Sequence, residues 1–407
     1  MKPPIALAEA QQTLLDGYGL LGTQRVALAE ASGRVLAEPI VAGHDQPLCA
    51  MSAMDGYAVR SADVVAGASF KLVGQAPAGA PFSGIVGPGE TVRIATGGCI
   101  PDGADRVVIQ ENVDIDGDQV VVRDPAGPAF IRPAGMDFKA GQLLLEAGAR
   151  LSPATLGLAA AAGWAELVVA RRPRVAILTC GDELREPGAT LAPGLTYNSG
   201  AYALAGLIDE WGGVPSLQPI IPDERAATLA SIAGLDRGTD VIAAIGGASV
   251  GERDVLRAAF AAAGAEHRFW RIAVVPGKPS WHARMSQGRP VLGLPGNPSS
   301  SFVCAHLLLK PLLYALTGRD PLGALKLSTA RLAEPLAANG AREAWLRATV
   351  SNCGGAMVAA VGARQDSGLQ LPLAAANALV RRAAGAGPAE KNAEVEFLPL
   401  GWPAGTS

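Results

Sequence analysis

The sequence predicts an α/β protein of several domains. Its 407 residues exceed what one hydrophobic core normally organises, so two to four domains are expected. From about residue 173 to about residue 320, apolar strands alternate with helices, which is typical of a mostly parallel sheet. Residues 46–140 and those after about 322 consist of short apolar runs separated by Gly, Pro and Asp, which favours small β-rich domains.

The composition narrows the class of partner. Hydrophobic residues make up 49% of the chain and charged residues 17%, as in a globular protein that buries much of its surface. The 34 Lys and Arg against 37 Asp and Glu give a net charge of −3, which offers no positive field for nucleic acid or an anionic membrane. We therefore expect neither a nucleic-acid partner nor a membrane.

The cysteines are few and far apart, which favours buried thiols in a reducing cytoplasm over disulfides. The sequence has no CxxC motif and no cluster of histidines, so a zinc site is not expected. The five cysteines are Cys49, Cys99, Cys180, Cys304 and Cys353.

Two apolar segments could be mistaken for targeting or membrane segments. The N-terminal "MKPPIALAEAQQTLL" is interrupted by Glu9 and two glutamines, so it predicts an amphipathic helix rather than a signal peptide. Residues 151–170 are about long enough to cross a bilayer, but they include Glu166. With Ser152 as N-cap and Pro153 in the first turn, they predict a buried helix that runs into a strand.

The predicted strands of the two β-rich regions are short. Those of residues 46–140 lie in "YAVRSADV", "SFKLVG", "TVRIATGG", "DRVVIQENV" and "DQVVVRD". Those of the C-terminal region lie in "AWLRATVSN", "GAMVAAVGA" and "AEVEFLPL".

In the α/β region, each strand leads into a polar loop and then a helix. The segments are "RVAILTCGDE" with "NSGAYALAGLIDEWGG", "VPSLQPIIPDERAATLASIAGL", and "TDVIAAIGGASVGERDVLRAAFAAAG". Parallel strands bring their carboxyl ends to one edge of the sheet, where ligands bind. The loops that follow these strands are therefore the first place to search for a site.

The loop in "AIGGASVGERD" is rich in glycine. Gly246 and Gly247 allow a turn in which backbone N–H groups and the Ser249 hydroxyl face an oxyanion, and Asp254 could cap the next helix or hold a divalent cation. A plain tight turn explains the pattern equally well. The spacing fits neither a Walker A loop nor a GxGxxG fingerprint.

Acidic residues follow two other strands. Asp182 and Glu183 come directly after one, and Asp223 and Glu224 follow another. Mg²⁺ prefers one or two carboxylates beside phosphate, so these acids are candidate ligands. The alternative is that they stabilise helix N-termini.

Two further loops could hold an anion. In "VVPGKPSWH", prolines on both sides of Gly277 and Lys278 hold the lysine in place; in "GLPGNPSSS", Gly296, Asn297 and three serines open a helix. The alternatives are a surface lysine and ordinary serine capping. Four of these loops, those that contain Asp182, Gly246, Lys278 and Gly296, are each expected at the carboxyl end of a strand of one predicted sheet, which predicts a phosphate-rich ligand in one crevice. No Ser/His/Asp set is evident, so catalysis would depend on positioning and charge stabilisation.

Seven motifs stand in an order and at a spacing that one family shares: "SAMDGYAVR", "RIATGGCIPDGADRVVIQEN", "GMDFKAG", "CGDEL", "GGASVGERD", "PGKP" and "GLPGNPSS". They resemble the molybdopterin molybdotransferase family, which includes MoeA and the gephyrin E domain. The resemblance covers nearly the whole chain, including "REAWLRATV" and "VEFLPL" near its end.

The resemblance implies an elongated chain of four domains that forms homodimers. A split first domain of helix and strands would comprise residues 1–45 and 141–172, with a β-rich domain, 46–140, inserted into it. Residues 173–321 would form the molybdopterin-binding α/β domain, and 322–407 a small β-barrel. The active site would lie between the third domain of one subunit and the second domain of its partner.

The implied reaction inserts molybdate into adenylylated molybdopterin with Mg²⁺ and releases AMP, in the cytoplasm. An upstream adenylyltransferase and a client molybdoenzyme are the implied partners. The implied catalytic residues are Asp55, Thr96, Asp137, Glu183 and Lys278. The implied pterin-binding residues are Gly181, Asp182, Gly246, Gly247, Ser249, Asp254, Pro295, Gly296, Asn297, Pro298 and Ser300. The implied Mg²⁺ ligands are Asp182, Glu183 and Asp223.

The chain departs from the family pattern at several site positions. Val275 stands where the family has lysine before "PGKP", and Met136 stands where it has an acid. Cys180 replaces the threonine of "STGDE", and Asn198 and Gly200 replace the aspartate and asparagine of "DSN". Loss of one fixed charge at a developing anion can cost about 10²-fold in rate.

Two hypotheses follow. The retained acids, Ser249 and Lys278 favour an active molybdenum-inserting enzyme. Val275, Asn198 and Gly200 favour a paralogue that binds the cofactor as a carrier or scaffold. A large gain in rate from Val275→Lys would identify the lost charge as what limits the protein. An unrelated nucleotide-binding enzyme is the third reading.

Overall fold

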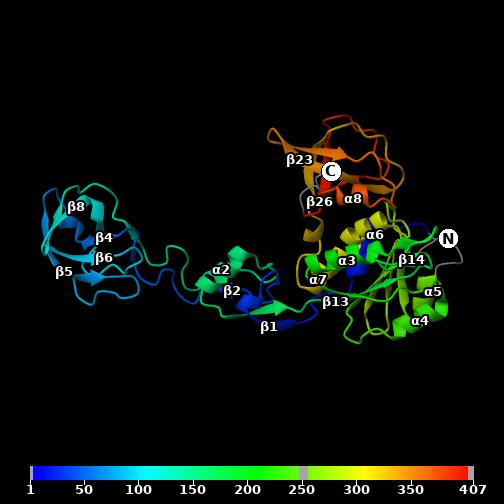
Figure 1. Ribbon diagram of the computed structural model, residues 1–407, viewed down its shortest axis with the longest axis horizontal. Coiled ribbons are helices and arrows are strands. Elements are labelled where there is room, and N and C mark those ends of the chain that lie inside the picture. Colours follow the sequence, from blue (N-terminus) through cyan, green and yellow to red (C-terminus); the bar gives the residue numbers. More distant parts are fainter. Residues whose placement is uncertain (1–2, 247–254, 402–407) are drawn as a thin grey trace.

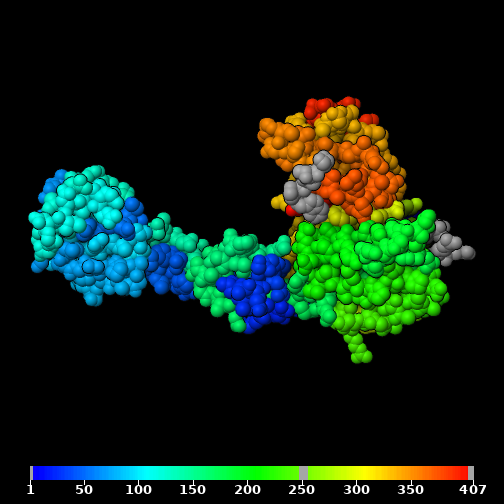
Figure 2. All heavy atoms as spheres, in the orientation of Figure 1, coloured from blue at the N-terminus to red at the C-terminus, as the bar shows by residue number. Residues whose placement is uncertain are grey.

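The computed structural model describes residues 3–246 and 255–401. The molecule is elongated (Figures 1 and 2). A β-rich domain occupies one end, a small first domain forms the middle, and an α/β domain with a C-terminal barrel packed on it forms the other end. This agrees with the four-domain architecture that the resemblance implies.

The first domain joins two segments that are far apart in the chain. Strand β1 (Thr23–Ala27) pairs antiparallel with β12 (Glu166–Ala170), and β2 (Ile40–Val41) pairs with β11 (Leu143–Leu145). Helix α2 (Pro153–Ala161) begins as expected, because the Ser152 hydroxyl accepts a hydrogen bond from the Thr155 N–H at 3.2 Å. Apolar side chains of both segments share one core, so neither segment folds alone.

The β-rich domain is a six-stranded sheet in the order β7-β4-β6-β5-β9-β8, with the short pair β3–β10 beside it. Valines and other apolar residues that alternate along the strands fill a small core on each face. The strands are β3 (Met51–Ser52), β4 (Gly56–Val59), β5 (Ser69–Ala76), β6 (Glu90–Ile94), β7 (Arg106–Ile109), β8 (Val113–Asp116), β9 (Gln119–Val122) and β10 (Ile131–Arg132).

The cysteines differ in part from expectation. Cys49 and Cys99 form a disulfide, so the prediction of thiols throughout was wrong for this pair. They are 50 residues apart in the chain, but the segment before β3 lies beside the turn after β6, where Met51 bridges Cys99, so their Cα atoms are 6.1 Å apart. The free thiols of Cys180 and Cys304 are buried, as predicted, and that of Cys353 is exposed.

The α/β domain contains a six-stranded sheet in the order β16-β13-β17-β21-β20-β18. The first four strands are parallel, and β20 and β18 add antiparallel pairs at one side. The strands are β13 (Arg174–Thr179), β16 (Val214–Leu217), β17 (Val241–Ile245), β18 (Glu266–Trp270), β20 (Trp281–Arg284) and β21 (Pro290–Leu294), and a separate small pair joins β14 (Leu184–Arg185) to β15 (Thr196–Tyr197).

Helices cover both faces of this sheet because alternate strand residues point to opposite faces. Val175 and Ile177 of β13 join one core with α3 (Ser199–Glu210) and α6 (Pro298–Cys304). Ala176 and Leu178 join the other core with α4 (Arg225–Ala233) and α5 (Val255–Ala262). A π-helical turn, Ala305–Leu309, continues α6 into α7 (Lys310–Leu316).

The N-terminal amphipathic helix is present as α1 (Leu7–Leu15). It falls in the range 1–45 assigned above to the split first domain, but it packs on α7 and β18 of the α/β domain. Leu7, Ala10 and Leu14 are buried in the α/β core, which explains this placement. The chain therefore contributes its first helix to the third domain before it enters the first.

Among the described residues, one helix is long and apolar enough to span a membrane. This is the continuous helix Pro298–Leu316, but 89% of its apolar stretch is buried within the protein, as in the core helix of a globular domain. Residues 151–170 instead form the end of a loop, α2 and β12, as the capping pattern predicted.

The C-terminal domain is a closed five-stranded barrel. It closes because β23 (Glu343–Cys353) pairs with both β24 (Ala356–Val361) and β25 (Ala378–Arg382). The remaining strands are β22 (Ser328–Leu332) and β26 (Glu394–Pro399). Strand β19 (Val274–Val275), from the α/β segment of the chain, pairs with β23 and links the two domains. A short helix α8 (Leu371–Ala374) lies between β24 and β25.

Candidate functional site

The loops after β13, β17 and β21 meet at the carboxyl edge of the sheet. The Gly246 N–H donates to the Leu294 carbonyl at 3.3 Å, and a Cβ on Gly296 would lie 3.5 Å from the Gly246 Cα. Gly246 has φ of +94°, and a Cβ there would lie 2.4 Å from the carbonyl oxygen of Cys180. Only glycine fits at this position without displacing a neighbouring loop.

The predicted acids share this edge. An Asp182 carboxylate oxygen accepts a hydrogen bond from the Asp223 N–H at 3.1 Å, and the Asp223 carboxylate accepts one from the Cys180 thiol at 3.1 Å. The Glu183 carboxylate folds over Gly181, where an added Cβ would lie 2.7 Å from it. All three acids are exposed to solvent. The structure therefore brings Asp182, Glu183 and Asp223 around one loop.

The Cys180 thiol stays protonated next to these acids. Burial raises its pKa well above the ordinary value, and the hydrogen bond to the Asp223 carboxylate raises it further. A neutral S–H can donate to the carboxylate, whereas a thiolate would repel it. Cys180 thus holds Asp223 in place, a role that the sequence did not indicate.

The acids are not by themselves a complete metal cage. Within residues 3–246 and 255–401, no group of three or more His, Cys, Asp or Glu side chains is arranged to hold a metal ion. Mg²⁺ commonly takes only one or two carboxylates and fills its other positions with water and substrate phosphate. Two neighbouring exposed carboxylates, Asp182 and Asp223, fit that kind of site.

The residues at the start of α6 are mostly covered by the barrel. The Asn297 side-chain amide donates to the Ser367 hydroxyl at 2.8 Å, and the Ser299 hydroxyl accepts from Arg347 at 2.8 Å. Pro295 and Ser300 are buried, Pro298 is half-buried, and Gly296 is exposed. Of these predicted residues, Gly296 and Asn297 are exposed at the loop edge, and the Asn297 amide is already bonded to Ser367.

The loop that carries Lys278 was predicted to follow a strand of the central sheet, and this was wrong. It follows β19, which pairs with β23 of the barrel. The loop nevertheless reaches the same edge, because β20 runs antiparallel to β21 and pairs Trp281 with Gly293 near the end of β21. Gly277, with φ of +123°, is packed so closely on the Cys304 sulfur that a Cβ would lie 2.1 Å from it. Lys278 is half-buried there.

A second group of predicted residues lies in the β-rich domain. The Asp55 carboxylate accepts hydrogen bonds from the Thr96 N–H at 2.6 Å and from the Thr96 hydroxyl at 2.8 Å. The backbone bond is the larger cause of a lowered pKa at Asp55, followed by the hydroxyl bond. Asp55 therefore remains an anion at neutral pH in a fixed orientation.

A cavity of about 150 Å³ adjoins this pair and is also lined by Tyr57, Arg93 and Gln110. Arg93 was not singled out from the sequence, although it stands in "RIATGG". The alternation of side chains along the strand could have indicated it. On β6, Arg93 is the exposed residue between buried Val92 and Ile94, so it faces outward. There it lines the same cavity as Asp55.

Asp137 stands apart from that pair. It lies in the connection between β10 and β11, is exposed, and its N–H donates to the Gln46 carbonyl at 2.9 Å. Its neighbour Met136 is 65% exposed. Gly247, Ser249 and Asp254 lie outside the described residues.

The three segments of the chain each match a described family. Residues 5–163 match the MoeA N-terminal region (domain I and II), residues 176–315 a probable molybdopterin binding domain, and residues 329–400 the MoeA C-terminal region (domain IV). Over 299 residues the chain is 35% identical to a molybdopterin molybdenumtransferase of Haemophilus influenzae, covering 73% of this chain and 74% of the relative. The chain belongs to the molybdopterin molybdenumtransferase (MoeA) family.

Other members agree. A molybdopterin molybdenumtransferase 2 of Mycobacterium tuberculosis is 36% identical over 305 residues, covering 72% of this chain and 75% of the relative. A solved MoeA structure from Pyrococcus horikoshii superposes with a TM-score of 0.83 at 29% identity, covering 98% of this chain and 100% of the other; a second has a TM-score of 0.82 at 26% identity, with the same coverage. Molybdenum cofactor biosynthesis is the process in which this family acts.

The departures from the MoeA pattern have defined surroundings. The Asn198 side-chain amide is buried and donates to the Thr179 hydroxyl at 3.1 Å, so it is used internally. A Cβ on Gly200 would make ordinary contacts, 3.8 Å from Ile245 and from the Ser301 hydroxyl. Val275 is half-buried, and its backbone pairs with Ala344 in the barrel. A lysine side chain at position 275 would start next to the Lys278 loop.

Within one chain the two groups of predicted residues are not brought together. Asp55 and Thr96 lie in the β-rich domain with β4 and β6, whereas Asp182, Asp223 and Lys278 lie in the α/β domain at the other end of the molecule (Figure 1). A MoeA site that uses both groups needs two copies of the chain.

Proposed function

We propose that this chain inserts molybdate into adenylylated molybdopterin, with Mg²⁺ and with release of AMP. The observation that carries the proposal is the meeting of the glycine loops and acids at one sheet edge. Gly246 and Gly296 let backbone approach a phosphate closely, and Asp182 and Asp223 lie beside them. The ligand expected from this chemistry is a phosphate-bearing molecule with a divalent cation.

Mg²⁺ would be held by Asp182 and Asp223, with Glu183 within reach of the same loop. When bound, it would neutralise charge on the adenylyl phosphate. The chain's own groups would orient the rest: the Cys180 S–H fixes the Asp223 carboxylate, and Lys278 supplies a positive charge from a rigid turn.

The proposed active unit is a homodimer. Asp55, held by two hydrogen bonds from Thr96, would be presented by the β-rich domain of one subunit to the α/β domain of the other. Asp137 would be reached from the same domain. We place this activity in the cytoplasm, between an upstream adenylyltransferase and a client molybdoenzyme.

The test is a single-turnover assay. Pure protein is mixed with adenylylated molybdopterin, molybdate and Mg²⁺, and both AMP release and reconstitution of an apo-molybdoenzyme are followed. AMP released only with molybdate, together with active reconstituted enzyme, is the expected result. Asp182→Asn should lower the rate at least about 10²-fold. Asp236→Asn is the matched control, because Asp236 is an exposed acid that precedes β17, at the opposite edge of the same sheet.

A second function is favoured by Val275, Asn198 and Gly200. The chain could bind adenylylated molybdopterin and act as a carrier or scaffold without turnover. Tight binding without AMP release would support this and contradict the transferase proposal. Val275→Lys then separates the two cases: a large gain in AMP release would show that a lost charge is what limits an otherwise complete site.

A further inference from the structure

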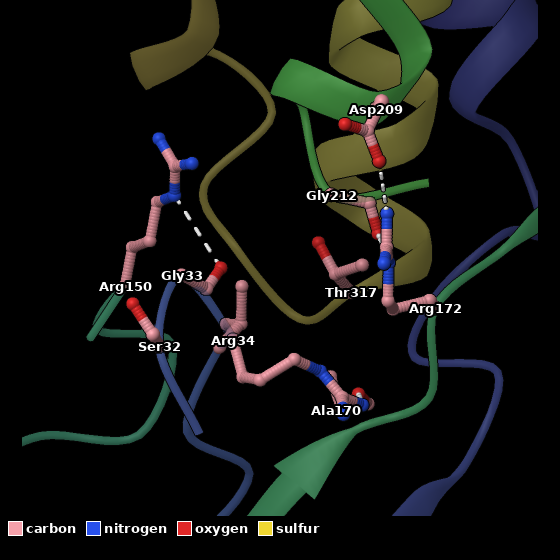
Figure 3. A pocket seen from close by; sticks show the side chains of 10 residues that line it. Ser32, Gly33, Arg34, Arg150, Ala170, Arg172, Asp209, Gly212 and Thr317 are labelled. Atoms are coloured by element: carbon pink, nitrogen blue, oxygen red, sulfur yellow. Dashed lines mark hydrogen bonds and ion pairs between the residues drawn. The ribbon is translucent and has the colours of Figure 1, made fainter. Parts of the chain in front are cut away.

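A cavity of about 220 Å³ lies where the first domain meets the α/β domain (Figure 3). None of the predicted site residues lines it. One side is formed by Ser32, Gly33, Arg34 and Arg150 of the first domain, and the other by Arg172, Asp209, Gly212 and Thr317. Arg172 lies in the connection from β12 to β13, so the cavity sits on the joint between the two domains.

The cavity carries more positive than negative charge. Three arginines line it against one acid, Asp209. Asp209 is used by Arg172, which donates to its carboxylate at 2.7 Å and to the Gly212 carbonyl at 3.3 Å. Neither Arg34 nor Arg150 has a carboxylate within ion-pair distance in the described parts of the chain.

The Arg34 guanidinium has an unused donor. Its Nη2 donates to the Ala170 carbonyl at 2.9 Å, and the Gln24 amide group lies 3.0 and 3.1 Å from its two terminal nitrogens. Its Nε is buried and has no hydrogen-bond partner among the described residues. Solvent does not reach this N–H, so an oxyanion in the cavity would be stabilised by the charge of the Arg34 guanidinium rather than by a direct hydrogen bond to Nε.

Arg150 faces the same space with donors to spare. Its Nε donates weakly to the Gly33 carbonyl at 3.4 Å, and its terminal nitrogens make no hydrogen bond within residues 3–246 and 255–401. Ser32 is exposed, and its hydroxyl is drawn near the base of the Arg150 side chain, away from the guanidinium group (Figure 3). Guanidinium groups donate pairs of parallel hydrogen bonds, which match the oxygens of a tetrahedral oxyanion.

Charged groups beyond the lining leave this balance positive. Glu210 lies close enough to Arg150 to sense its charge, and burial raises the pKa of Glu210. The positive charge of Lys310 lowers the pKa of the same glutamate, and Arg319 adds a further positive charge near Arg150. The positive charges of half-buried Arg34 and Arg172 also repel each other, and partial burial followed by this repulsion lowers the pKa of Arg34.

We infer that this cavity binds a small tetrahedral oxyanion such as sulfate, phosphate or molybdate. A volume of about 220 Å³ is below the roughly 300–1,000 Å³ of pockets that hold larger ligands, so a nucleotide or a pterin does not fit. The anion would bridge Arg34 and Arg150 of the first domain to Arg172 and so stiffen the joint between domains. The inference does not depend on the proposed transferase activity.

The test is calorimetric titration of the full-length protein with sulfate, phosphate and molybdate, with chloride used to keep ionic strength constant. Arg150→Gln should weaken binding by about tenfold or more, because one charge-assisted donor pair is lost. Arg174→Gln is the matched control: Arg174 pairs with Asp236 at 2.9 Å, as Arg172 pairs with Asp209, but it does not line the cavity.

A further variant separates this cavity from the glycine loops, which could also bind an oxyanion. Lys278→Gln should not affect oxyanion binding at the cavity, which Arg150→Gln should weaken. Thermal unfolding gives a second readout, since the oxyanion should raise the midpoint in wild type and in Arg174→Gln but much less in Arg150→Gln. The inference is overturned if no oxyanion binds saturably, if Arg150→Gln binds as wild type does, or if Lys278→Gln abolishes all binding.

Discussion

At the scale of single residues, the candidate site depends on residues that cannot be replaced by chemically similar ones. Gly246 accepts a left-handed backbone with a carbonyl oxygen 2.4 Å from where a Cβ would be. Cys180 needs its proton in order to donate to Asp223. Both constraints act through neighbouring loops, so a change at either residue moves more than one part of the edge.

Gly246→Ala should destabilise the α/β domain by about 1–3 kcal/mol and reduce AMP release at least tenfold, because the loop after β13 must shift. Gly264→Ala is the control. Gly264 has a similar φ of +84°, but a Cβ there meets nothing within 4 Å. Urea unfolding of both variants separates the backbone cost, which they share, from the steric cost. Equal destabilisation of the two would contradict the close contact between loops.

Thiol labelling should follow burial and pKa. Burial raises the pKa of Cys304 to about 12, and burial with the Asp223 hydrogen bond raises that of Cys180 as well, so both stay neutral and shielded at pH 8. We expect iodoacetamide to label the folded chain once at pH 8, at exposed Cys353. Mass spectrometry of wild type and Cys353→Ser measures this. Fast labelling of Cys180 in the folded variant would contradict the buried, protonated thiol.

At the scale of elements, the sequence was informative where local chemistry decides the structure. The capped start of α2 and the strand–loop–helix order were predicted from Ser152, Pro153 and the apolar patterns. Pairings between distant segments were not. Strand β19 precedes the Lys278 loop as predicted, but nothing in "VVPGKP" shows that its partner is β23 of the barrel. The Cys49–Cys99 bond was missed for the same reason, since spacing along the chain does not report neighbouring segments.

The contact between α6 and the barrel should depend on Arg347. This buried side chain donates to the Ser299 hydroxyl at 2.8 Å and to the carbonyls of Leu369, Arg364 and Asp366 at 2.9–3.0 Å. Arg347→Leu removes these four hydrogen bonds of a buried side chain and should lower the apparent free energy of unfolding by about 2–4 kcal/mol. Arg331→Leu, on β22 of the same barrel, removes one exposed bond at 3.4 Å and should cost less than about 0.5 kcal/mol. Similar losses in both variants would argue against the network.

The disulfide should stabilise the β-rich domain. Closing a loop of 50 residues removes conformational entropy worth about 4 kcal/mol from the unfolded chain. Cys99→Ser and wild type in reductant should therefore share a lower unfolding temperature, and reductant should not affect Cys99→Ser. Differential scanning calorimetry with and without reductant measures the shift. If Cys99→Ser unfolded at the same temperature as oxidised wild type, the disulfide would contribute little to the stability of the β-rich domain.

At the scale of the whole molecule, the distance between the two predicted groups matters most. Asp55 and Thr96 are at one end of an elongated chain, and the glycine loops are at the other (Figure 1). The family motifs indicated each group but not this separation, since a sequence does not state which copy of the chain a residue serves. Gly247, Ser249 and Asp254 lie outside the described residues, so their part in the candidate site stays a prediction.

Mixing two inactive variants tests the shared site. Asp55→Asn disables the β-rich contribution and Asp182→Asn the α/β contribution. If each site uses both subunits, random mixed dimers contain one intact site, so an equal mixture should recover roughly a quarter of wild-type AMP release. The single variants alone, and mixtures kept below the temperature of subunit exchange, are controls. No recovery after confirmed exchange would contradict a site built between subunits.

The insertion of one domain into another also sets an order of events during synthesis. Strand β1 leaves the ribosome early, but its partner β12 follows only after the whole β-rich domain, since Thr23 pairs with Ala170. At about 5–20 residues per second, β1 waits for about 7 to 30 seconds. The β-rich domain is one continuous segment and can fold in that interval. The β-rich domain at the end of the molecule is therefore expected to fold first, and the first domain that connects it to the rest is expected to fold later.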